Sequence, residues 1–172
     1  MPTSFKIVGY VTGIIAKAVA EGVVYLLSAA SLTGEEYVFR LRRPPEWLFV
    51  GTPISGTLVK VGEYYQIQDL AAAENLKQAR PVEIESLELT VVRKGDGEDV
   101  IATGGSGATY ISAPLLSKNV YKKAEKLRNS RCILYVADLP TGSKVVAVQT
   151  PEEYRKSMAL KRFLTWVSDY EE

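Results

Sequence analysis

The chain has 172 residues, a formal net charge of +1, one cysteine and no histidine. Without histidine it has no Ser-His-Asp or Cys-His nucleophile and no imidazole metal ligand, and a single cysteine excludes an intrachain disulfide and a thiolate-rich zinc site. Catalysis by carboxylate, lysine or tyrosine side chains stays open. No motif indicates a catalytic residue, so we expect a non-enzymatic protein with neither a cofactor nor a bound metal.

The hydrophobicity pattern predicts a folded protein outside the membrane. No apolar run approaches the roughly 18–20 residues that a membrane-spanning helix needs. The start, Met1–Lys6, lacks the basic and apolar regions of a secretory signal. We therefore expect a cytoplasmic protein with no membrane partner. The scarcity of asparagine, glutamine and cysteine is typical of a thermophilic source.

The first 70 residues predict five consecutive strands separated by turn signals. These strands cover Phe5–Ala20, Val23–Leu32, Glu36–Arg42, Pro53–Val61 and Glu63–Leu70. The third strand alternates, with Phe39 among apolar residues on one face and Arg40 and Arg42 on the other. Five strands without a helical crossover predict a meander or a small barrel.

A three-strand meander, a short connector and a closing hairpin follow one another in this half. The segment Val50–Tyr65 reads VGTPISGTLVKVGEYY. This order and this segment resemble the OB-fold, a small barrel that binds nucleic acids, over well under half of the chain. The connector Arg43–Thr52 departs from that pattern, because it is too short for the long helix that OB-folds often carry there. An SH3-like small barrel is the alternative.

The second half mixes helices and strands. Residues 70–80 predict a helix capped by Asp69 and stopped by Pro81, which divides the chain into a barrel (1–70), a helical linker (71–81) and an α+β module (82–172). The expected elements of the module are a strand at Val82–Lys94, short strands at Val100–Thr103 and Ala108–Ala113, a helix at Leu115–Asn129, a hairpin of Arg131–Leu139 with Lys144–Gln149, and a final helix from Thr150 to about Tyr170. The predicted fold is therefore β-rich, an OB-like five-stranded barrel followed by an α+β module that ends in a helix.

The net charge hides a separation of signs within the module. Residues 83–99 contain six acidic and two basic side chains, a net charge of −4, whereas residues 115–131 contain six basic and one acidic, a net charge of +5. A helix with so many cations could lie along a phosphate backbone, although a solvated helix face explains the same pattern.

The candidate binding residues combine cations and aromatic rings, the mixture that single-stranded nucleic acid requires. Phosphate contacts are expected from Arg40, Arg42, Arg43 and Lys60, and base stacking from Tyr25, Trp47 and Tyr64. The basic helix would extend the path through Lys118, Lys122, Lys123 and Lys126. The hypothesis is a protein that binds single-stranded DNA or RNA without chemistry. Alternatively, these aromatic residues pack in the core of the barrel and bind nothing.

Two other classes of function remain. Opposite-sign segments could pair between protomers, which favours an assembly or interaction subunit of a larger complex, for example a viral one, with a protein partner or a homo-oligomer. A magnesium-dependent nuclease would instead use acidic residues, namely Glu83, Glu85, Glu88, Asp96 and Asp99. The segment Gly104–Gly107 lacks the Gly-Lys-Ser/Thr sequence of a phosphate-binding loop and is interpreted as a hairpin loop.

Overall fold

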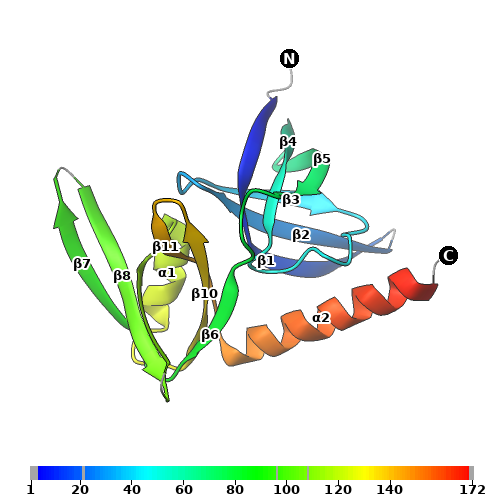
Figure 1. Cartoon of the computed structure of the whole chain (residues 1–172). Coiled ribbons are helices and arrows are strands. Elements are labelled where there is room, and N and C mark those ends of the chain that lie inside the picture. The colour runs from blue at the N-terminus through cyan, green and yellow to red at the C-terminus, as the bar shows by residue number, and fades with distance from the viewer. Residues whose placement is uncertain (1–3, 21, 96, 108, 171–172) are drawn as a thin grey trace.

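The computed structural model describes residues 4–20, 22–95, 97–107 and 109–170, with the backbone alone for residues 64, 94, 109 and 164–170. These residues form a β-rich structure with eleven strands and two helices (Figure 1). The first five strands are β1 (Ser4–Val19), β2 (Gly22–Ser31), β3 (Glu36–Leu41), β4 (Pro53–Val61) and β5 (Tyr64–Ala72). The five strands predicted for this half are confirmed.

These five strands close into a ring in the order β1-β2-β3-β5-β4, in which β4 pairs back with β1. All neighbours are antiparallel except β3 and β5, which pair in parallel at Phe39↔Tyr65 and Arg40↔Gln66. The apolar side chains that alternate along the strands, such as Leu27, Phe39 and Leu58, meet inside the ring and are fully buried. The predicted alternation of β3 is therefore confirmed.

The second half contains two three-stranded sheets and a short helix. One sheet has the order β11-β10-β6 and the other the order β7-β8-β9. The elements are β6 (Arg80–Ile84), β7 (Glu88–Lys94), β8 (Gly97–Ser106), β9 (Thr109–Pro114), α1 (Lys118–Lys126), β10 (Cys132–Leu139) and β11 (Gly142–Gln149). The sheets and α1 share a core that includes Ile84, Val120 and Leu134. The predicted hairpin of β10 and β11 is confirmed.

The two halves also share a core of their own. Tyr10, Val50 and Ala79 of the first 79 residues pack in one buried cluster with Tyr135 and Val146 of the second half. The boundary between two modules was expected near Pro81, but residues from before and after it are buried in the same cluster.

Three sequence predictions in the second half need correction. The expected helix at residues 70–80 is absent: Ala71 and Ala72 continue β5 by pairing with β4, and the chain then turns toward β6. Pairing and packing outweigh the helix propensity of the alanines there. The predicted strand 82–94 is two strands in different sheets, β6 and β7. The helix predicted at 115–129 is shorter, because Leu115 and Leu116 donate their N–H groups to Val100 and Val145.

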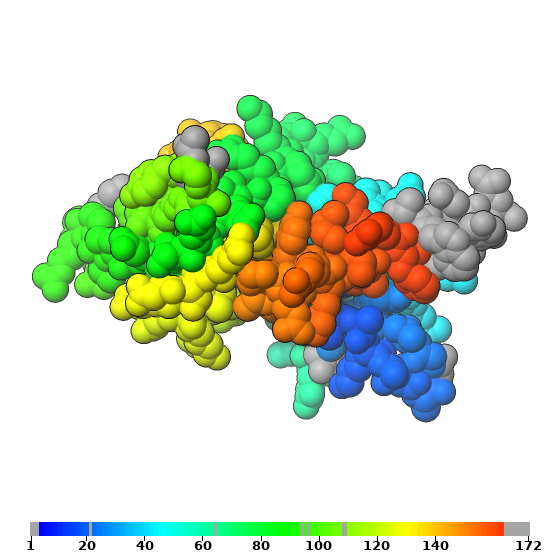
Figure 2. Space-filling model, turned by 90° about the horizontal axis from the view of Figure 1, so that it is seen from below, coloured from blue at the N-terminus to red at the C-terminus, as the bar shows by residue number. Residues whose placement is uncertain are grey.

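The helix α2 (Pro151–Tyr170) confirms the predicted C-terminal helix. Its start is a capping box, since the N–H of Thr150 donates to Glu153 Oε1 at 2.9 Å and the N–H of Glu153 donates to Thr150 Oγ1 at 3.0 Å. Seen from below in Figure 2, the first part of α2 (orange) lies between the α1 segment (yellow) and the strands β1 and β2 (blue). Leu160 packs on the ring core and Tyr154 on the shared core, so α2 joins the two halves. Among the described residues, no helix is long and apolar enough to cross a membrane.

Candidate functional site

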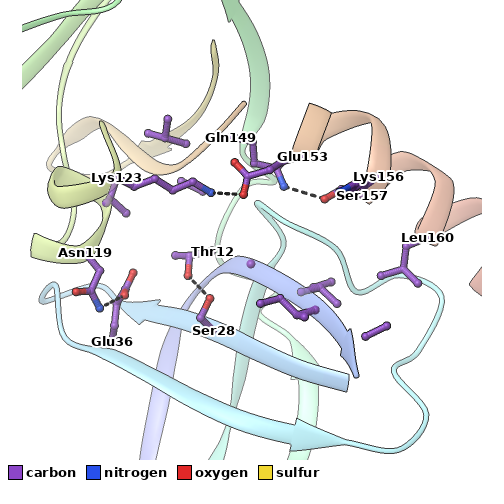
Figure 3. Close-up of a pocket in the computed structure, with 17 residues that line it drawn as sticks. Thr12, Ser28, Glu36, Asn119, Lys123, Gln149, Glu153, Lys156, Ser157 and Leu160 are labelled. Carbon is purple, nitrogen blue, oxygen red and sulfur yellow. Dashed lines mark hydrogen bonds and ion pairs between the residues drawn. The ribbon is translucent and has the colours of Figure 1, made fainter. Parts of the chain in front are cut away.

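A groove of about 680 Å³ opens where the ring meets the second half of the chain. Strands β1 and β2 form one side of it, and α1, β11 and the first half of α2 form the other (Figure 3). Polar side chains from these elements and from the start of β3 line it: Thr12, Ser28, Glu36, Asn119, Lys123, Gln149, Glu153, Lys156 and Ser157. Its size lies within the range of small-ligand sites, about 300–1,000 Å³.

Contacts between helices shape one wall of the groove. Lys123 Nζ of α1 lies 2.8 Å from Glu153 Oε2 of α2. Gln149 at the end of β11 donates to Ser157 Oγ at 2.8 Å and accepts from the Tyr135 hydroxyl at 2.6 Å. These bonds fix the start of α2 against α1 and β11. Figure 3 shows Lys123 and Glu153 directed toward each other across this wall.

Hydrogen bonds also join the ring to α1. Glu36, at the start of β3, accepts from Ser117 Oγ at 3.1 Å and from the side-chain amide of Asn119. Ser117 caps α1 as well, because its Oγ accepts from the N–H of Val120 at 3.2 Å. A carboxylate at a helix N-terminus is favoured by the helix dipole. Glu36 therefore places the first turn of α1 beside β3.

Glu153 is the groove acid with a shifted pKa. Partial burial acts to raise the pKa of Glu153, but the hydrogen bonds from Lys123 and Thr150 and the charge of Lys123 outweigh it. The net result is a pKa below the ordinary value, so Glu153 stays ionised and its charge is balanced by Lys123.

A second hollow of about 470 Å³ lies along α1 and is distinctly basic. It is lined by Asn119, Lys122, Lys123, Lys126, Leu127 and Thr150. Asn119 and Lys123 line both hollows, so the two adjoin. Lys118, Lys122 and Lys126 are spaced by four residues and form an exposed row on α1.

Known proteins give no further guide to this site. The chain matches no protein-family model and no curated protein.

The structure separates the cations expected on the ring. Arg40 is exposed on the outer face of β3, whereas β3 ends at Leu41, so Arg42 and Arg43 are exposed just beyond its end. Lys60 lies two residues after Leu58 on β4 and therefore shares its strand face, the one directed into the ring. Lys60 is exposed because it lies near the end of β4, and its face is opposite to that of Arg40. Lys60 is therefore not on the same surface as Arg40, although both were predicted to contact phosphates.

The aromatic residues expected to stack bases are largely core residues. Tyr25 is 8% exposed and packs inside the ring, so it cannot offer a stacking face. Trp47 is half-buried against the same core. The side chain of Tyr64 lies outside the described part of the structure. Burial of large rings in a small ring of strands explains the first two corrections.

The lysines of the basic helix differ in their exposure. Lys118, Lys122 and Lys126 are exposed, whereas Lys123 is half-buried in its pair with Glu153. The sequence gives no signal for most other groove residues, because Thr12, Ser28, Asn119 and Gln149 are far apart along the chain. Local signals place two of the groove residues: the basic helix places Lys123, and the pattern from Thr150 to Glu153 at a helix start places Glu153.

The acidic residues considered for a magnesium site are not brought together. Within the described residues, no group of three or more His, Cys, Asp or Glu side chains could hold a metal ion. Glu83 pairs with Arg131 instead, and Glu88 and Asp99 lie at opposite ends of the β7–β8 ladder. Asp96 lies outside the described residues.

The glycine-rich segment is not a phosphate-binding loop. Gly104, Gly105 and Ser106 belong to strand β8, and only Gly107 lies in the turn. A Cβ on Gly104 would press on the side chain of Ile84 and lie 3.0 Å from the carbonyl oxygen of Ser86. The glycine is therefore explained by close packing of β8 on the β6 segment.

Proposed function

We propose that the protein binds single-stranded nucleic acid along a track that leads from the outer face of β3 through the groove to the lysine row of α1. The observation that carries the proposal is that a groove lined by Lys123 and Lys156 opens between the two halves of the chain. The exposed Arg40 of β3 lies beyond its ring side, and the lysine row of α1 lies on its other side. We also propose that the ring is an OB-like barrel, a fold whose exposed strands bind oligonucleotides. Its strand order and the parallel pairing of β3 with β5 support this.

The pairing registers connect the parts of this track. Ser28 of β2 lines the groove and pairs with Val38 of β3. One step further on the same face, Leu26 pairs with Arg40. Arg40 therefore lies one strand across from Ser28, about 4.8 Å, and one step of about 6.6 Å along the strand, on the same outer face.

On the other side of the groove, α1 continues the track. Lys123 lines the groove, and Lys122 and Lys126 line the adjoining basic hollow. A phosphate backbone that enters the groove would meet these ammonium groups in succession. The proposal prefers single strands because their bases are free to leave the stack and enter the groove.

The acids of the groove limit how the strand runs. Glu153 is balanced by Lys123, and Glu36 is engaged by Ser117 and Asn119. Because Tyr25 is buried and Trp47 is half-buried, affinity should come mainly from charge. Binding should therefore depend strongly on salt and weakly on base identity.

The test is fluorescence anisotropy with a labelled oligonucleotide, as a single strand and as a duplex of the same sequence. We expect binding of the single strand at low salt, weaker binding of the duplex, and a linear fall of log K with log salt concentration. No binding of either form at low salt would refute the proposal.

A further inference from the structure

The strand β7 lies at one edge of its sheet. Within the described residues, β7 pairs only with β8, and Figure 1 shows it as the outermost strand of the second half. An uncovered edge presents a row of unpaired backbone N–H and C=O groups to a further strand. Folded proteins usually guard such an edge with charge, yet Val91 at its centre is apolar and 49% exposed.

The turn after β7 determines which backbone groups face outward. Residues 94 and 97 pair across a two-residue turn. The pair next to such a turn is hydrogen-bonded, and bonded and non-bonded pairs then alternate along the ladder. Residues 90, 92 and 94 therefore bond to β8, while Leu89, Val91 and Arg93 direct their backbone groups to the free edge.

We propose that this edge pairs with β7 of a second copy of the chain, antiparallel and centred on Val91, to form a symmetric dimer. The sequence of β7 is self-complementary in this register. Val91 meets Val91 of the second copy, and Leu89 meets Arg93, so every outward-facing residue pairs with another outward-facing one. All seven residues of the strand take part. A two-fold axis through Val91 gives the closed arrangement typical of homodimers.

Charge favours the same register. The sequence has an acidic residue at position 88 and a basic residue at position 94, which face each other across the axis. Opposite charges in directly facing positions stabilise a strand pair, whereas like charges destabilise it. The small net charge of the chain, +1, leaves little overall repulsion between two copies.

The side chains at the centre of the edge supply apolar contact. Val91 pairs with the half-buried Val100 of β8 and shares a strand face with Leu89, which packs on the module core. In the dimer, Val100, Val91 and their two symmetry mates would form a row of four valines across four adjacent strands. This row would extend the apolar core of each copy across the dimer interface. Val91 would then be buried in the dimer, which explains why a valine is exposed at this position in the single chain.

The experiment is analytical ultracentrifugation of the full chain over a range of protein concentrations. We expect a monomer–dimer equilibrium for the wild type and a monomer for Val91→Lys, because two lysines would meet on the axis. Val61→Lys is the matched control, since Val61 is 51% exposed and lies on the ring; it should dimerise like the wild type. A wild type that stays monomeric, or a dimer that Val91→Lys leaves intact, would overturn the proposal.

A crosslinking variant tests the register without adding charge. In a hydrogen-bonded antiparallel pair the Cα atoms are about 5.5 Å apart, a distance that a disulfide spans. Val91→Cys should therefore form a covalent dimer on oxidation, whereas Thr90→Cys, which faces position 92 of the other copy, should not. The native Cys132 is buried and does not compete. Equal crosslinking of the two variants would contradict a pairing centred on Val91.

Discussion

At the scale of single residues, Gly51 is the point where the ring meets the second half. Its φ of +90° is strained for any residue with a Cβ. A Cβ there would also lie 2.9 Å from Tyr135 Cδ1 and 3.3 Å from the Ala79 Cβ. Its N–H donates to Val11 and its carbonyl accepts from Ala79, so the backbone cannot move away without losing both bonds.

Gly51→Ala should therefore destabilise the protein by at least about 1–3 kcal/mol. Gly62→Ala is the control, because Gly62 has a φ of +65° but nothing within 4 Å of the added Cβ. It should cost only the backbone strain, about 1–2 kcal/mol. Urea denaturation measures both. A Gly51→Ala variant as stable as the Gly62→Ala variant would show that crowding against Tyr135 is unimportant.

Glu153 makes the free energy of unfolding depend on pH. Because its folded pKa lies below the unfolded one, its ionised form stabilises the fold above the unfolded pKa, and this contribution is lost as pH falls through the folded pKa. Glu153→Gln keeps an acceptor for the N–H of Thr150 but loses the pair with Lys123. We expect a loss below about 1 kcal/mol at pH 7, since the pair is partly exposed.

Denaturant unfolding from pH 7 to pH 3 measures this difference. The difference in free energy of unfolding between the wild type and Glu153→Gln should decrease as pH falls below about 4. Glu152→Gln serves as control, because Glu152 pairs with Lys156 at an exposed surface. A gap that stays constant across this range would contradict the role assigned to the Lys123–Glu153 pair.

At the scale of elements, sequence patterns are reliable where local chemistry decides the structure. Alternation along β3 and the Thr150–Glu153 capping box both act within a few residues, and both were predictable. The helix expected at residues 70–80 fails because propensity competes there with pairing to β4. The break between β6 and β7 has no local signal either, since Leu87 is buried by contacts from distant segments.

The candidate site is less predictable than the fold for the same reason. The exposure of Arg40 follows from alternation on one strand, and the exposed lysine row of α1 follows from helical spacing. The burial of Tyr25 and the separation of Lys60 from Arg40 depend on how the strands close into a ring. The groove itself needs residues from six elements, so no single stretch of sequence reveals it.

At the scale of the whole molecule, the shared core predicts that the two halves unfold together. Val50 and Tyr135 come from different halves and exclude water in one cluster. Calorimetry should therefore show one transition, with equal calorimetric and van't Hoff enthalpies. Two resolved transitions would show that the ring and the second half are independent, and that the shared cluster adds little stability.

The central claim is that cations from both halves act on one nucleic-acid strand. It is tested most directly by the salt dependence of single-strand binding for two double variants, Lys122→Ala with Lys126→Ala and Arg40→Ala with Arg42→Ala. Each lost phosphate contact should lower the slope of log K against log salt by about 0.7, so each double variant should lower it by about 1.4. Lys6→Ala, on the outer face of β1 beside β4, should leave the slope unchanged. A slope that either double variant leaves at the wild-type value would contradict the claim.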